Sequence, residues 1–179
     1  MPMLRRRPHA IVLKTMVTHT VTYFVAGVTA YVLFDYPTLI AESALGRSMR
    51  PMDDPLVMAG PLFQPLRGLL FGLVCSLLGQ PFFDQPRGWL TMWIVLVALG
   101  IVGTFAAPPG SLEGVIYTTL PVSLHLTLLP ELLAQSLMLS WILFHWVTAT
   151  RRWLTWTMWA AFAVVLLLPA LGLLTTVQR

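Results

Sequence analysis

The stretch WLTWTMWAAFAVVLLLPALGLLT, residues 153–175, decides the fold, because its 23 residues contain no charged side chain. An α-helix needs about 20 apolar residues to cross the ~30 Å hydrocarbon layer of a bilayer. Towards the N-terminus lie four further apolar stretches of similar length, residues 129–149, 89–107, 55–79 and 11–34. The sequence therefore predicts an all-α integral membrane protein, a bundle of five transmembrane helices.

The composition places nearly all of the chain in the membrane. Apolar residues make up 57% of the 179 residues and charged residues only 10%, which is far from the balance of a soluble domain. The connections between the apolar stretches reach about 20 residues at most, too few to fold around a core of their own. We therefore expect residues 1–179 to form a single transmembrane domain.

The basic residues are distributed unevenly between the two ends of the predicted spans. Lys and Arg in short loops are retained on the cytoplasmic side of a membrane. If the N-terminus is cytoplasmic, the cytoplasmic ends carry Arg5, Arg6, Arg7, Lys14, Arg87, Arg151 and Arg152, and the outer connections carry Arg47, Arg50 and Arg179. The seven tryptophans, Trp93 and Trp146 among them, fall near the same cytoplasmic ends, where indole prefers the headgroup level. The sequence predicts a multi-pass protein of the bacterial inner membrane, with the N-terminus cytoplasmic and the C-terminus outside.

These basic residues explain the net charge of +4 without a nucleic-acid partner. Arg151, Arg152 and Trp153 form a basic and aromatic edge on the cytoplasmic side that suits an anionic lipid headgroup. Simple anchoring at the interface is the preferred interpretation of the same residues. The expected partners are the bilayer, anionic lipids at the cytoplasmic face and other membrane subunits.

A charged residue lies inside the second span, where an unpaired charge costs several kcal/mol in hydrocarbon. This residue is Arg67, in the stretch GPLFQPLRG, residues 60–68. The two prolines of this stretch each remove a backbone donor and can restart the helix. If the spanning helix begins at Pro61, Arg67 lies about two turns, or ~9 Å, below the outer surface.

Glu131 in the fourth span is the natural counter-charge for Arg67, and we expect the two to pair. The alternative for Glu131 is a helix start, because it follows Pro130 directly and an acid suits the positive end of a helix. Other polar side chains are expected at a similar depth, in a pocket open to the outer side, namely Gln64, Gln135, His125 and Asp35.

The connection between the third and fourth spans is too apolar for a free loop. Irregular backbone at membrane depth is tolerated only against protein or a water-filled cavity. Residues 108–128 are therefore expected to lie in the interface or to re-enter the membrane, as a lid over Arg67 and Glu131. Packing against another subunit is the alternative for this segment.

Two local patterns predict structure rather than chemistry. Gly68 and Gly72 form a GxxxG pair, which lets two membrane helices approach closely. Asp54 precedes Pro55 at the start of an apolar run, a pattern typical of a helix N-cap followed by the first helical residue. We prefer this interpretation of Asp54 to a metal site.

No catalytic residue, metal ligand or cofactor is predicted. The chain lacks the common hydrolase, zinc and phosphate-loop motifs, and its single cysteine, Cys75, excludes a thiolate-rich metal site. A haem or pigment held by His19 or His145 is an alternative that fits poorly, because the two residues differ by ~7 Å in depth. We expect His19 to hydrogen-bond a neighbouring helix instead.

Three functions remain open. The small size and the lack of a catalytic motif favour a non-catalytic accessory or structural subunit of a larger membrane complex. A small carrier or channel would use Arg67, Glu131 and Gln64 as an outer-facing polar site that prefers anions. A membrane-embedded lipid-modifying enzyme would use Glu131 or His125 as its base, and it is less favoured because no motif supports it.

Overall fold

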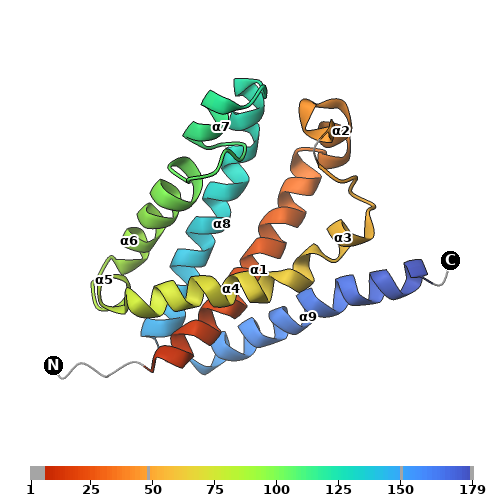
Figure 1. The fold of residues 1–179 in the computed structure, drawn as a ribbon. Coiled ribbons are helices and arrows are strands. Elements are labelled where there is room, and N and C mark those ends of the chain that lie inside the picture. Colours follow the sequence, from red (N-terminus) through yellow and green to blue (C-terminus); the bar gives the residue numbers. More distant parts are fainter. Residues whose placement is uncertain (1–6, 48, 150, 178–179) are drawn as a thin grey trace.

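The computed structural model describes residues 7–47, 49–149 and 151–177, and these residues form helices and connections without a strand. The helices are α1 (Pro8–Leu33), α2 (Tyr36–Glu42), η1 (Ala44–Arg47), α3 (Pro55–Met58), α4 (Gly60–Leu77), α5 (Gly79–Phe83), α6 (Gly88–Val95), η2 (Leu96–Val102), α7 (Leu112–Tyr117), α8 (Val122–Thr148) and α9 (Arg152–Val177) (Figure 1).

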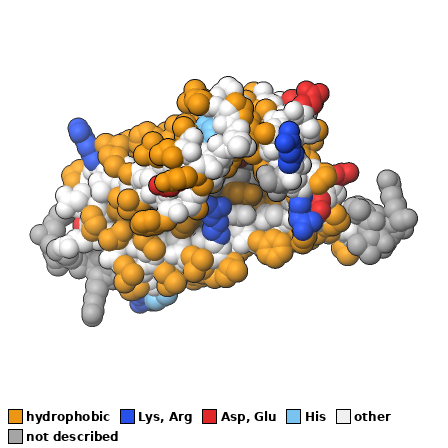
Figure 2. Space-filling view, turned by 45° about the horizontal axis from the view of Figure 1, so that its top comes forward, with side chains coloured by type: hydrophobic (Ala, Val, Ile, Leu, Met, Phe, Trp, Pro, Cys, Tyr) orange, Lys and Arg blue, Asp and Glu red, His pale blue; other side chains and the backbone are white. Residues whose placement is uncertain are grey.

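Four of these helices, α1, α4, α8 and α9, are long and apolar enough to cross a membrane. Figure 2 shows hydrophobic side chains spread across one face of the molecule, with few charged side chains between them. An apolar exterior of this kind is suited to lipid rather than to water. The predicted all-α class is confirmed, and the four long apolar helices are consistent with the predicted membrane protein.

The third predicted span, residues 89–107, corresponds to a shorter helix. α6 continues into the π-helical turns of η2, and together they cover Gly88–Val102, so this apolar helix is shorter than the other four. Its 15 residues fall below the roughly 20 that a helix needs to span the hydrocarbon alone. The chain then continues without regular structure from Gly103 to Ser111.

α8 begins seven residues before the predicted start of the fourth span, at Val122 instead of residue 129. Pro130 lies inside this helix, and Glu131 lies about two and a half turns from its start. The helix-start interpretation of Glu131 is therefore wrong. The apolar residues before Pro130 favour a continuous helix, and membrane helices tolerate an internal proline because other groups satisfy the freed carbonyl. The irregular part of segment 108–128 is correspondingly short.

α1 lies at the centre of the fold and packs against α4, α8 and α9 (Figure 1). Its closest contact is with α4, at the two glycines of the GxxxG pair. A Cβ atom on Gly68 would come within 2.7 Å of the Met16 Cα, and one on Gly72 within 2.8 Å of the Val12 Cα. The predicted role of this pair in helix packing is confirmed.

The break before α4 fixes the depth of Arg67. Asp54 caps α3, because its Oδ1 accepts a hydrogen bond from the Leu56 N–H at 2.8 Å, and Pro55 occupies the first turn. This N-cap prediction is confirmed. The helix then restarts at Gly60, so Arg67 lies two turns inside α4, as expected for a helix that begins near Pro61.

Two of the tryptophans differ from the expected interfacial belt. Trp146 is only 1% exposed, and its Nε1 donates to the Thr155 Oγ1 at 2.9 Å. Trp93 is half-buried and donates from Nε1 to the Ser136 Oγ at 3.1 Å. Both indoles therefore join helices inside the bundle, because a buried N–H needs a partner. Trp153 and Trp156 remain exposed.

Candidate functional site

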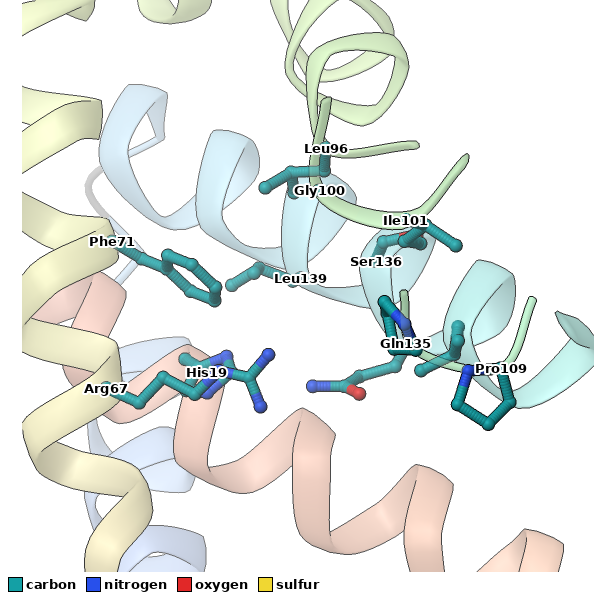
Figure 3. A pocket seen from close by; sticks show the side chains of 12 residues that line it. His19, Arg67, Phe71, Leu96, Gly100, Ile101, Pro109, Gln135, Ser136 and Leu139 are labelled. Atoms are coloured by element: carbon teal, nitrogen blue, oxygen red, sulfur yellow. The ribbon is translucent and has the colours of Figure 1, made fainter. Parts of the chain in front are cut away.

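A cavity of about 210 Å³ lies between α1, α4, η2 and α8 (Figure 3). Its polar lining comes from His19 on α1, Arg67 on α4, and Gln135 and Ser136 on α8. Apolar side chains supply most of the remaining wall. A small apolar pocket with a few converging polar groups is typical of a small-molecule site.

Arg67 is the charged residue of this cavity. Its side chain lies over the Phe71 ring, with the guanidinium carbon 5.5 Å from the ring centroid. Figure 3 shows the guanidinium pointing towards the Gln135 amide on the opposite wall. In the described part of the chain no carboxylate oxygen lies within 4 Å of Arg67, so the expected Arg67–Glu131 ion pair is not formed. The guanidinium is therefore left facing a cavity without a counter-charge.

Glu131 has a different partner. Its Oε2 accepts a hydrogen bond from the Tyr36 hydroxyl on α2. Burial raises the pKa of the Tyr36 hydroxyl, and the hydrogen bond to Glu131 raises it further. Tyr36 was not among the predicted site residues, because nothing in the sequence pattern indicates that the start of α2 reaches α8.

The Tyr36–Glu131 pair lines a second cavity of about 280 Å³, which is otherwise apolar. Its wall includes Leu39, Met49 and Met52. The two cavities share three lining residues, Pro108, Pro109 and Leu132. Glu131 and Arg67 therefore belong to neighbouring cavities and not to one polar cluster.

His19 and Gln64 form a hydrogen-bonded pair between α1 and α4. The His19 Nε2 lies 3.3 Å from the Gln64 Oε1, and both side chains are buried. The expected hydrogen bond from His19 to a neighbouring helix is confirmed. The sequence did not indicate that His19 also lines the Arg67 cavity. The antiparallel register set by Gly68 and Gly72 is the signal that brings these two helix segments together.

His125 lies apart from the other residues of the predicted cluster. It is 2% exposed, and its Nδ1 accepts a hydrogen bond from the Gly110 N–H at 3.0 Å. A Cβ on Gly114 would come within 3.1 Å of the His125 Cε1. His125 therefore holds the segment around α7 against α8. Asp35, also expected in the pocket, is exposed at the left-handed turn between α1 and α2.

The segment before α7 covers both cavities in part. Pro108 and Pro109 line each of them, and the Ser111 Oγ caps α7 by accepting from the Gly114 N–H at 2.9 Å. The expected position of this connection over the polar residues agrees with these contacts. The two residues with which it lines these cavities are prolines, which have no backbone N–H to satisfy.

The other candidate residues lie outside the cavity. The His145 ring packs edge-on against Trp141, 4.6 Å between centroids, and does not line the His19 cavity. Arg151, Arg152 and Trp153 are exposed around the start of α9. Among the described residues no three His, Cys, Asp or Glu side chains gather in a way that could hold a metal ion.

Comparisons with protein-family models, with curated proteins and with solved structures gave no match to this chain. The function is therefore argued from the site. Guanidinium groups donate several hydrogen bonds in a planar array that suits carboxylate and phosphate oxygens. Arg67 and the opposed Gln135 amide provide such donors around one small volume.

Proposed function

We propose that this protein is a small membrane carrier that binds an anionic solute at Arg67. The observation that carries the proposal is the position of the Arg67 guanidinium, which lines a cavity and has no carboxylate within 4 Å in residues 7–47, 49–149 and 151–177. A charge inside a membrane helix is costly unless a partner or water neutralises it, and such residues commonly mark substrate paths. An anionic solute supplies the missing charge.

The cavity sets the size of this solute. Its volume of about 210 Å³ lies below the ~300–1,000 Å³ typical of sites for drug-sized ligands. An inorganic oxyanion or a short carboxylate is the matching class. Arg67 would bind the anion directly, and Gln135 would orient it from the facing helix α8.

The proposed topology has five membrane crossings in a bacterial inner membrane. α6 and η2, extended by the irregular chain after Val102, would provide the third crossing. With the N-terminus cytoplasmic, Arg67 lies seven residues, or ~10 Å, from the outer end of α4, so the site opens outwards. Arg151, Arg152 and Trp153 then lie at the cytoplasmic face, where anionic lipid headgroups would contact them.

Uptake into proteoliposomes tests the carrier. We expect the wild type to accumulate at least one of radiolabelled phosphate, sulfate and acetate, and Arg67→Met to lose more than nine-tenths of that uptake. Arg87→Gln is the matched control, because it removes one positive charge from an exposed side chain outside the cavity. Failure of all three anions to enter or to bind would contradict the proposal.

An accessory subunit of a larger membrane complex is the second candidate. It is supported by α7, whose four apolar side chains Leu112, Val115, Ile116 and Tyr117 are exposed. An apolar patch outside the long helices suits a protein partner as well as the lipid interface. Native mass spectrometry of the protein isolated from its own membrane distinguishes the two functions, since a subunit would retain a stoichiometric partner chain and a carrier would not.

A lipid-modifying enzyme is not proposed. Glu131 and His125 were its candidate bases, and each is held by a hydrogen bond to another part of the fold, Glu131 to Tyr36 and His125 to Gly110. Neither residue lines the Arg67 cavity, in which the proposed ligand binds.

A further inference from the structure

The tautomer of His19 follows from its neighbours. The Gln64 Nε2 donates to the Gly60 carbonyl oxygen at 3.3 Å, and a carbonyl oxygen can only accept. This contact orients the Gln64 amide so that its Oε1, an acceptor, faces the His19 Nε2 at 3.3 Å. The His19 Nε2 must therefore carry the proton, and in the neutral ring Nδ1 presents a bare lone pair.

That lone pair has no partner among the described residues. The His19 Nδ1 is buried and makes no hydrogen bond, and the residue as a whole is only 1% exposed. A buried acceptor left unpaired is unfavourable, and each such group calls for an explanation. Figure 3 places His19 beside Arg67 on one wall of the cavity, with Gln135 opposite. The unpaired acceptor thus belongs to a residue that lines the same cavity as the cation.

These groups together define what the cavity recognises. Arg67 donates only, so it requires acceptor oxygens with negative charge. The His19 Nδ1 accepts only, so it requires an O–H or N–H on the ligand. Gln135 satisfies either kind of group through its amide. A simple anion without a proton fulfils the first requirement and leaves the second unmet.

We propose that the ligand of the Arg67 cavity is an oxyanion that keeps a hydroxyl proton at neutral pH, of the hydrogen phosphate class, and that His19 is its specificity-determining residue. The inference rests on the proposed anion site and adds the chemical class of its ligand. Sulfate has the same tetrahedral shape but no proton at neutral pH, so it would leave the His19 lone pair unpaired.

Binding measurements on the full chain in nanodiscs test this selectivity. Isothermal titration with inorganic phosphate and with sulfate, at neutral pH and equal ionic strength, should give phosphate about tenfold tighter binding, which corresponds to about 1.4 kcal/mol. In His19→Leu the phosphate affinity should fall to that of sulfate, while sulfate affinity stays within about twofold, since sulfate makes no use of Nδ1.

A spectroscopic measurement on the wild type covers the case in which His19→Leu does not fold. In protein labelled with ¹⁵N-histidine, the His19 Nδ1 resonance should move on addition of phosphate and stay in place with sulfate. Single variants of His9, His125 and His145 assign the signal by elimination.

The outcomes separate this inference from the proposed function. Equal affinity for the two anions, tighter binding of sulfate, or an Nδ1 signal that ignores phosphate would overturn the selectivity and leave the Arg67 anion site standing. If neither anion binds, nor any short carboxylate, the anion site itself is refuted and the inference falls with it.

Discussion

Arg67 and Glu131 are both charged residues inside long apolar helices, yet the fold treats them differently. Glu131 accepts a hydrogen bond from Tyr36 beside an apolar cavity. Arg67 lines the neighbouring cavity, and no described carboxylate reaches it. A charge that the fold satisfies is explained by structure alone, whereas a charge that faces an open volume without a partner indicates a ligand. The comparison therefore locates the candidate site at Arg67 and not at Glu131.

The two helices beside Arg67 explain why no carboxylate of the described residues reaches it. Neither α1 nor α4 contains an Asp or Glu, so the closest-packed helix pair of the fold offers no counter-charge. Glu131 comes from α8, and its Oε1 lies 3.8 Å from where a Gly27 Cβ would be, near the far end of α1. α2 folds back at Asp35, where φ is 45°, and brings Tyr36 to Glu131.

The largest loss of stability is expected from a substitution that disturbs the contact between α1 and α4, the helix that carries Arg67. Gly68→Ala would bring a Cβ within 2.7 Å of the Met16 backbone, which cannot move aside without separating α1 from α4. We expect the free energy of unfolding in detergent to fall by about 3 kcal/mol, at the upper end of overpacking costs. Anion binding should be lost as well, because His19 and Arg67 lie on these two helices.

Gly60→Ala is the matched control for this variant, since a Cβ there meets nothing within 4 Å on the same helix α4. Its free energy of unfolding should stay close to that of the wild type. Equal stability of the two variants would show that α1 and α4 are not held in the close contact described here.

The next largest loss of stability is expected when the Tyr36–Glu131 hydrogen bond is removed. Tyr36→Phe should lower the free energy of unfolding by about 2 kcal/mol, because a hydrogen bond to a charged acceptor is lost. Glu131→Leu should cost a similar amount by leaving the Tyr36 hydroxyl without an acceptor. Loss of both partners should cost much less than the sum, which a double-mutant cycle measures.

Phosphate binding supplies the control for this pair of variants. It should remain within about twofold of the wild type in both single variants, since a loss of tenfold or more would correspond to about 1.4 kcal/mol of direct participation. A loss of that size would place Glu131 in the binding site and remove the distinction between the two cavities.

Replacing Arg67 should have a smaller effect on the stability of the protein without bound anion. Arg67→Met removes a charge that has no carboxylate partner among the described residues, so the free energy of unfolding without anions should change by less than about 0.5 kcal/mol, or increase. The stabilisation by added anion, about 2.7 kcal/mol at a hundred times the Kd in the wild type, should disappear. A strong destabilisation without anion would instead indicate a structural role for Arg67.

The sequence predicted the parts of this arrangement that follow from local chemistry. Apolar length identified α1, α4, α8 and α9 as possible spans, and the Asp54–Pro55 pair and the Gly68–Gly72 pair were assigned correctly. The partner of Glu131 could not be predicted, because Tyr36 reaches it through a turn at Asp35 that has no marker glycine. The start of α8 was missed because Pro130 resembles a helix start but lies within the helix.

The smallest effect belongs to an arginine and an acid that do pair. The Arg50 guanidinium donates to the Asp54 carboxylate at 2.9 Å, just before the first residue of α3. This hydrogen bond, together with that from the Leu56 N–H, lowers the pKa of Asp54 below its ordinary value of 3.8. A depressed pKa in the folded state means that the pair stabilises α3 above the ordinary pKa, and that this contribution is lost as the pH falls through the lowered value.

Titration of the Asp54 carboxyl carbon by NMR checks this pair. Arg50→Gln should raise the titration midpoint towards the ordinary value and leave the global unfolding curve nearly unchanged, because exposed ion pairs contribute little. An unchanged midpoint would show that the backbone hydrogen bond alone depresses the pKa. Arg50, whose carboxylate partner lies near the protein surface, should therefore matter little to the fold. Arg67, which no carboxylate of the described residues reaches, is the arginine on which we expect function to depend.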